Sequence, residues 1–186
     1  MSPKARAKLL ATVGSSLAIV GAIIAGKALT DDVRPVRPGS EAPSFSAVNL
    51  ANSDTVSLRD YEGSVILLNL WATWCAPCEV EMPSMQRLYE QLGPRGLKVV
   101  AVSVDTQESA LVAQWVTERG LTFDVLHDRS GKIMIDYQAT GWPESFIIDR
   151  DGVIVRKIWG PAEWDDPAEV AVFRRLLGLP ETAGDG

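Results

Sequence analysis

The sequence predicts an α/β domain in which helices flank a central mixed β-sheet. Apolar runs of strand length, such as residues 65–71 and 97–104, alternate with segments of helical periodicity. This alternation is typical of a parallel core with right-handed crossover helices. The turn sequence Arg150-Asp151-Gly152 separates two later apolar runs, so it predicts a hairpin that adds antiparallel strands to the sheet.

The individual elements follow from the apolar patterns in chain order. Weak alternation on both sides of residues 52–54 predicts an N-terminal β-hairpin. Apolar residues at helical spacing after Glu79 predict a helix, which ends where Gly93 breaks the chain. The expected ranges are strands 45–50, 55–58 and 65–71, helix 79–92, strand 97–104, helix 108–119, strand 123–126, helix 132–137, strands 145–149 and 153–159, and helix 167–177.

The two cysteines of the chain, Cys75 and Cys78, lie where a buried strand turns into a helix. Cys75 then falls at the helix N-terminus, where unpaired backbone N–H groups and the helix dipole favour a thiolate. Thiol–disulfide exchange needs one attacking sulfur of low pKa and a second sulfur that resolves the mixed disulfide. The pair therefore predicts a redox site.

Two other interpretations of the cysteine pair are weaker. A zinc site needs about four ligands, and beyond the two cysteines the chain has one histidine, His127, which we expect in a loop after a strand. We therefore expect no metal and no cofactor. A purely structural disulfide would close a very short loop, which gains little from cross-linking. The residues between the cysteines, Ala76 and Pro77, carry no cation that would stabilise a thiolate, which favours a reductant over an oxidant.

The N-terminal segment is predicted to anchor the chain in a membrane. Three cations within residues 1–8 precede the 18 uncharged residues 9–26, a length near the lower limit for a transmembrane helix. The cations predict that the N-terminus stays in the cytoplasm. A cleaved signal peptide is the alternative, but its apolar core is shorter, and Lys27 stands where small residues are expected. The expected organisation is a basic cytoplasmic N-terminus 1–8, a signal anchor 9–28, a tether 29–40, a domain 41–178 and a flexible tail 179–186.

Charge is divided unevenly along the chain. Residues 1–38 hold six Lys or Arg and two Asp, whereas the remainder holds 12 Lys or Arg against 22 Asp or Glu. An acidic exported domain argues against nucleic acid as a partner and against lying flat on anionic lipid. Disulfides form and persist outside the cytoplasm, so the expected compartment suits a redox cysteine pair.

Four motifs together match one known family. They are Ala42-Pro43-x-Phe45, the run from Asn69 through Trp71, Trp74 and Cys75 to Cys78, Glu81-Met82-Pro83, and the run from Gly141 through Pro143 to Asp149. Over about residues 40–178, the chain resembles the membrane-anchored thioredoxin-like thiol–disulfide oxidoreductases of bacteria, the ResA/TlpA/CcmG (DsbE) group. The resemblance implies a thioredoxin-like fold and an enzyme of that class.

The resemblance also implies roles for individual residues. Cys75 corresponds to the exposed nucleophile of the family and Cys78 to its buried resolving cysteine. Glu81 corresponds to the active-site glutamate, and a partly buried carboxylate one helical turn after Cys78 is suited to accept its proton; the alternative is a solvated helix residue. Asn69 is neutral where thioredoxin has a buried aspartate, so the acid–base task falls to Glu81.

Three further residues correspond to the substrate groove of the family. Pro143 matches the cis-proline of a loop that lies beside the cysteines and presents backbone to an extended substrate. Trp74 is expected to pack beside the motif and to shield the thiolate. Trp142 is larger than the small or β-branched residue expected before that proline, so it either gates the groove or packs on Cys75.

The resemblance implies a reductant of disulfides in exported proteins such as apocytochrome c, acting in cytochrome c maturation. A membrane electron donor of the CcdA/DsbD type would reduce it again. The expected location is the bacterial cell membrane, with a single span, the N-terminus inside and an extracytoplasmic catalytic domain. Two other classes remain open: a thiol peroxidase, because residues 42–45 also match the opening of peroxiredoxins, and a non-catalytic thioredoxin-fold adaptor, which retention of the site residues disfavours.

Overall fold

The structure is a computed structural model that describes residues 35–180 of the chain. Seven strands form one mixed sheet in the order β2-β1-β5-β4-β3-β6-β7. The three strands β3, β4 and β5 are parallel, and every other neighbouring pair is antiparallel. The strands are β1 (Ser46–Asn49), β2 (Thr55–Ser57), β3 (Val65–Trp71), β4 (Leu97–Ser103), β5 (Asp124–His127), β6 (Glu144–Ile148) and β7 (Ile154–Trp159).

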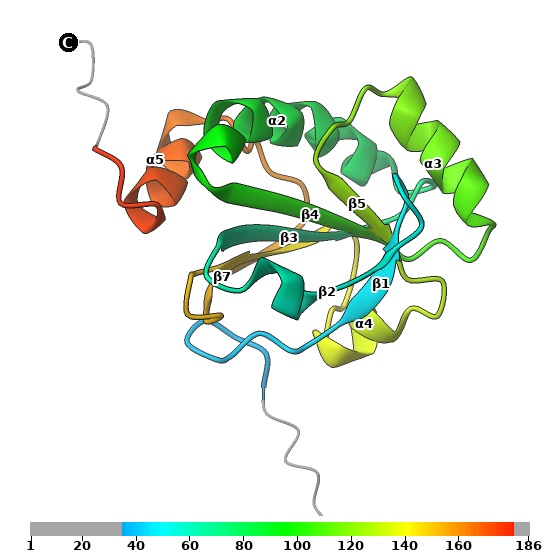
Figure 1. Cartoon of the computed structure of the whole chain (residues 1–186), viewed down its shortest axis with the longest axis horizontal. Helices are drawn as coiled ribbons and strands as arrows, with labels where there is room; N and C mark the ends of the chain where they lie inside the picture. Colours follow the sequence, from blue (N-terminus) through cyan, green and yellow to red (C-terminus); the bar gives the residue numbers. More distant parts are fainter. Residues whose placement is uncertain (1–34, 181–186) are drawn as a thin grey trace, which may run out of the picture. The chain divides into compact units, whose positions relative to one another are not determined.

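Helices cover both faces of the sheet, as Figure 1 shows. Helices α2, α3 and α5 lie on one side and α4 on the other, which agrees with right-handed crossovers from β3 to β4 and from β4 to β5. All residues of β3 are buried, because both faces of the sheet are covered there. The helices are α2 (Ala76–Leu92), α3 (Ser109–Glu118), α4 (Lys132–Asp136) and α5 (Pro167–Leu176), with short 3-10 turns η1 (Leu58–Tyr61) and η2 (Gly93–Arg95).

The predicted α/β architecture with a mixed sheet and an N-terminal hairpin is confirmed, with two differences in detail. Helix α2 begins three residues earlier than the apolar pattern indicated, because Cys75 caps it and Pro77 occupies its first turn, where a missing N–H costs nothing. The expectation that His127 lies in a loop was wrong. It is the last residue of β5, it is buried, and its ring nitrogens contact the Asp105 carbonyl and the Ser109 hydroxyl.

The first described residues pack against the start of β7 and the segment that follows α4. The Gly39 N–H donates to the carbonyl of Ile154 at 2.8 Å, and the Val36 N–H donates to the Gln138 side chain at 3.1 Å. The anchor predicted over 9–28 and the basic segment 1–8 lie outside the described residues. Within residues 35–180, none of the helices has the length and apolar character that crossing a membrane requires.

Candidate active site

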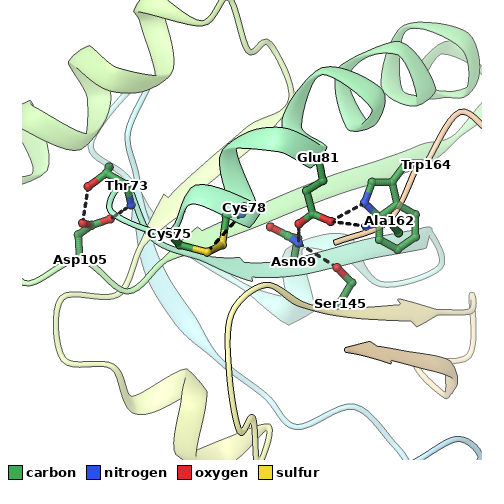
Figure 2. Close-up of a disulfide and its surroundings, with 9 residues drawn as sticks. All are labelled: Asn69, Thr73, Cys75, Cys78, Glu81, Asp105, Ser145, Ala162 and Trp164. Atoms are coloured by element: carbon green, nitrogen blue, oxygen red, sulfur yellow. Dashed lines mark hydrogen bonds between the residues drawn. A yellow bond between two sulfur atoms is a disulfide. The ribbon is translucent and has the colours of Figure 1, made fainter. Parts of the chain in front are cut away.

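The two cysteines form a disulfide at the start of α2 (Figure 2). Strand β3 ends at Trp71 and α2 begins at Ala76, so a short turn carries the first cysteine from the sheet to the helix. Cys75 is the N-cap residue of α2, and its sulfur accepts a hydrogen bond from the backbone N–H of Cys78 at 3.3 Å. The prediction that Cys75 lies at a helix N-terminus is therefore confirmed.

The two sulfur-bearing residues differ in access to solvent. Cys75 is 6% exposed and Cys78 is fully buried, so Cys75 is the cysteine that a partner can approach. In the disulfide form, Cys75 is therefore less exposed to solvent than its correspondence to the exposed nucleophile of the family implied. The N-terminus of α2 stabilises negative charge at Cys75, whereas burial of Cys78 favours its neutral thiol form.

The carboxylate of Glu81 lies inside the protein, so the interpretation of Glu81 as a solvated helix residue was wrong. Glu81 is 1% exposed. It accepts hydrogen bonds from the Asn69 side chain at 2.7 Å, the Ala162 N–H at 3.1 Å and the Trp164 indole N–H at 3.2 Å. The spacing of three residues places it on the same face of α2 as Cys78. No sequence pattern pointed to Ala162 or Trp164, which are distant along the chain.

Burial changes the acidity of this carboxyl group. Loss of hydration raises the pKa of Glu81 from 4.5 to about 7, against the opposing effect of the hydrogen bonds from Ala162, Asn69 and Trp164. A carboxyl group of this pKa exchanges protons near neutral pH, where a general acid–base group is most effective.

Asn69 connects the sheet to this carboxylate. Its side chain is fully buried on β3, and its amide nitrogen donates to Glu81 and to the Ser145 hydroxyl of β6, the latter at 2.8 Å. In the view of Figure 2, the amide lies between the disulfide and the Glu81 carboxylate. The Asn69 side chain thus holds the Glu81 carboxylate in place.

A second buried carboxylate, Asp105, supports the turn before Cys75. Its two oxygens accept hydrogen bonds from the Thr73 N–H at 2.9 Å and from the Thr73 hydroxyl at 2.7 Å. Our sequence reasoning missed this contact. A signal existed, because Thr73 and Asp105 each follow the carboxyl end of a strand by two residues, and β3 and β4 are parallel neighbours.

The three predicted substrate-binding residues lie on two adjacent loops. The rings of Trp74 and Trp142 meet edge to face, with centroids 5.1 Å apart, and their exposed fractions are 63% and 39%. The bond from Trp142 to Pro143 is cis, as the resemblance implied, and Pro143 itself is buried. Another exposed indole, that of Trp159, lies beside Gly141, and no sequence motif pointed to it.

Comparison with known proteins agrees with this geometry. Residues 38–157 match the AhpC/TSA family. The chain is 38% identical over 151 residues to thiol-disulfide oxidoreductase ResA of Oceanobacillus iheyensis, a match that covers 80% of this chain and 77% of the relative. It is 39% identical over 129 residues to the ResA protein of Bacillus cereus, covering 69% and 73% of the two chains.

A solved structure shows the same fold. The crystal structure of a protein described as a thiol:disulfide interchange protein DsbE from Chlorobium tepidum superposes with a TM-score of 0.65 at 29% identity, covering 76% of this chain and 96% of that one. The disulfide at the helix N-terminus, the buried glutamate and these likenesses lead to one assignment. The chain belongs to the AhpC/TSA family, and it is a thiol–disulfide oxidoreductase with a thioredoxin-like fold.

Proposed function

We propose that this enzyme reduces disulfides in other extracytoplasmic proteins while tethered to a membrane, with apocytochrome c as its class of client. The observation that carries the proposal is the disulfide of Cys75 and Cys78 at the start of α2, one turn from the buried Glu81. The identity of the client rests on the likeness to ResA proteins and on the resemblance to the ResA/TlpA/CcmG group.

The reaction begins with both cysteines reduced. The Cys75 thiolate attacks one sulfur of the client disulfide, so a mixed disulfide forms and the other client sulfur leaves as a thiolate. Cys78 then loses its proton and attacks the sulfur of Cys75, which releases the second client thiolate. Two electrons pass from the enzyme to the client, the client gains two thiols, and the disulfide observed in the structure is the product state of the enzyme.

Glu81 accepts the proton of Cys78 in this scheme. Its pKa of about 7 leaves a substantial fraction ionised at neutral pH, and it lies one helical turn from Cys78. The alternative, a thiol peroxidase, uses a peroxidatic cysteine without a vicinal partner, whereas Cys75 is bonded to Cys78 here. A non-catalytic adaptor would have no use for a buried carboxyl group whose pKa is near neutrality.

The client contacts the loops that surround Cys75. Trp74 directly precedes Cys75 and Trp142 directly precedes Pro143, and the ring contact between the two indoles joins the loops into one exposed aromatic surface. Indoles of this kind supply much of the binding energy of protein interfaces. This aromatic surface therefore binds the extended segment of the client that carries the disulfide.

A reductant outside the cytoplasm needs a supply of electrons. The proposed signal anchor over 9–28 would hold the domain, through the tether 29–40, at the outer surface of a bacterial cell membrane with the N-terminus inside. A membrane protein of the CcdA/DsbD type would then reduce the disulfide. This part of the proposal rests on the three cations of residues 1–8 and the uncharged stretch that follows them.

The proposal is tested by trapping clients with the full chain that carries Cys78→Ser. This variant still attacks through Cys75 but cannot resolve, so the client stays linked. In a bacterium that makes c-type cytochromes, the linked proteins should be rich in exported proteins with a CxxCH sequence, and the Cys75→Ser/Cys78→Ser control should trap none.

We expect a reduction potential nearer to about −270 mV than to about −120 mV, because Ala76 and Pro77 supply no cation. A value near about −120 mV, or fast consumption of hydrogen peroxide in place of disulfide reduction, would contradict the proposal.

A further inference from the structure

The side-chain oxygen of Asn69 is an unusual atom in this site. Asn69 is fully buried, and its Oδ1 has no hydrogen-bond partner among residues 35–180. A buried carbonyl oxygen without a donor costs free energy, and such atoms are rare in folded proteins. Two further side-chain atoms of the described part share this property, in Trp71 and Tyr137, but Asn69 alone of the three contacts Glu81.

The orientation of the Asn69 amide is fixed by its neighbours. The ionised form of the Glu81 carboxyl group accepts hydrogen bonds and donates none, and the Asn69 amide nitrogen faces it at 2.7 Å. The same nitrogen donates its other hydrogen to Ser145 at 2.8 Å. The oxygen is thereby held on the opposite side of the planar amide, away from both partners.

That opposite side is the side of Cys78. Cys78 and Glu81 lie one turn apart on the same face of α2, and Asn69 lies beneath that face on β3. In Figure 2, the Asn69 oxygen is the end of the amide that faces the disulfide. The sulfur of Cys78 carries no hydrogen while it is bonded to Cys75, so the oxidised protein has nothing there to donate.

We propose that Asn69 is a positioning residue whose Oδ1 accepts a hydrogen bond from the Cys78 thiol once the disulfide is reduced. This inference rests on the proposed function and extends it to the reduced state. A dithiol donor supplies two electrons, its own sulfurs join in a disulfide, and the bond between Cys75 and Cys78 breaks. Cys78 takes up one proton, and the new S–H group points at Asn69, while Cys75 remains a thiolate and the second donor proton goes to solvent.

Two consequences follow for the chemistry. The hydrogen bond stabilises the neutral form of Cys78, so it maintains the difference between an attacking thiolate at Cys75 and a resolving thiol at Cys78. The hydrogen bond also forms only in the reduced protein, so it stabilises the dithiol form of the enzyme relative to the disulfide form. Removing the Asn69 oxygen should therefore make the protein a stronger reductant.

The direct test is the S–H stretching band of Cys78 in the infrared spectrum of the full chain. Cys75→Ala leaves Cys78 as the single thiol and adds no competing acceptor. In this background, Asn69→Leu should shift the band to the higher frequency of an unbonded thiol. Asn69→Asp retains an oxygen of similar position, so its band should stay at the lower, hydrogen-bonded frequency. Ser145→Ala is the matched control, because it removes a partner of the amide nitrogen and leaves Oδ1 in place.

The second readout is the equilibrium with glutathione in chains that keep both cysteines. Asn69→Leu should shift it about fivefold toward the disulfide, the factor that one net hydrogen bond of about 1 kcal/mol represents, and Ser145→Ala should leave it within about twofold. An unshifted band and an unchanged equilibrium in Asn69→Leu would overturn the inference, as would equal effects of Ser145→Ala. Wild-type chain that fails to reduce disulfides would instead overturn the proposed function, so the two failures are distinguishable.

Discussion

Asp105 accepts hydrogen bonds from both the backbone N–H and the hydroxyl of Thr73, at 2.9 Å and 2.7 Å. Thr73 precedes Cys75 by two residues, so a buried carboxylate on the loop after β4 fixes the turn that carries the attacking cysteine. Asp105 is itself 2% exposed and accepts a further hydrogen bond from the Ser103 hydroxyl at 2.7 Å. The position of Cys75 thus depends on a contact between the ends of two parallel strands.

Asp105→Ala should loosen this turn. The change leaves the Thr73 donors without their partner, and a buried unpaired donor costs about 1–3 kcal/mol. We expect the oxidised protein to lose about 2 kcal/mol of unfolding free energy in denaturant titrations, and Cys75 in the reduced protein to react several-fold more slowly with iodoacetamide at pH 7. Asp151→Ala, at an exposed turn position, is the control and should change stability by less than about 0.5 kcal/mol. Equal losses in the two variants would remove Asp105 from the support of the site.

The stability of the oxidised protein should fall as pH rises toward neutrality, because of Glu81. Burial raises its pKa from 4.5 to about 7 in the folded state, so the folded protein binds more protons than the unfolded chain between these values. The contribution of Glu81 to the free energy of unfolding is then lost as pH rises from about 4.5 to about 7. Above that range, this contribution no longer changes with pH. A shift of this size corresponds to about 3 kcal/mol. Denaturant unfolding at several pH values measures it, and Glu81→Gln should abolish this component; an unchanged pH dependence in the variant would assign it to other groups.

The fold was predictable because its two central elements have strong patterns. The apolar run of β3 and the helical spacing of α2 each point to one structure, and the cysteines lie at their junction, so Cys75 and Cys78 could be identified from spacing alone. The role of Glu81 could be predicted only from the resemblance to the family, because a single glutamate on a helix is usually solvated.

The remaining contacts of the site were not predictable because they are made by the tertiary structure. Trp164 reaches Glu81 across more than 80 residues of sequence, and periodicity carries no information about such contacts. His127 was assigned to a loop because the strand pattern of β5 is short, and a polar residue at its end resembles a turn. Its ring is buried because it bonds to the Asp105 carbonyl at 2.7 Å, a partner that only the fold supplies.

The boundary of the folded domain can be tested with two shorter chains. A chain that begins at Pro35 keeps the bonds from Val36 to Gln138 and from Gly39 to Ile154, and also the bond from the Ile154 N–H to the Ser40 carbonyl. A chain that begins at Glu41 loses all three. At about 1 kcal/mol for each hydrogen bond, the shorter chain should be about 2–3 kcal/mol less stable in denaturant titrations, while both should reduce a small disulfide at similar rates. Equal stabilities would show that residues 35–40 act only as a tether.

Trp142→Ala should separate recognition of a protein client from chemistry at Cys75. The indole is 39% exposed and contacts Trp74, so it adds area to the aromatic surface proposed to bind the client. Loss of an aromatic anchor costs about 2 kcal/mol or more at an interface, so the rate constant at low client concentration should fall about 30-fold. Reduction of a small aromatic disulfide should change by less than about threefold. Leu111→Ala, an exposed apolar residue on α3, is the control, and an equal loss with both substrates would indicate damage to the site.

Glu81→Gln should slow the release of the client far more than its capture. Attack by Cys75 needs no proton acceptor, because the N-terminus of α2 stabilises its thiolate, whereas Cys78 must lose a proton before it attacks. A positioned general base contributes about 10²–10⁴-fold, so we expect release of the mixed disulfide to slow by about 100-fold and its formation to change by less than about twofold. Rapid-quench experiments with a disulfide peptide resolve the two steps.

The pH profile distinguishes this role of Glu81 from a structural one. Because the carboxyl group must be ionised to accept the proton, the release rate of the wild type should rise with pH through about 7, the pKa that burial gives Glu81. In Glu81→Gln that inflection should disappear, and the rate should instead rise only as Cys78 ionises by itself at higher pH. A variant that keeps the inflection near neutrality, or that slows capture and release equally, would mean that Glu81 supports the packing between α2 and Trp164 and takes no part in proton transfer.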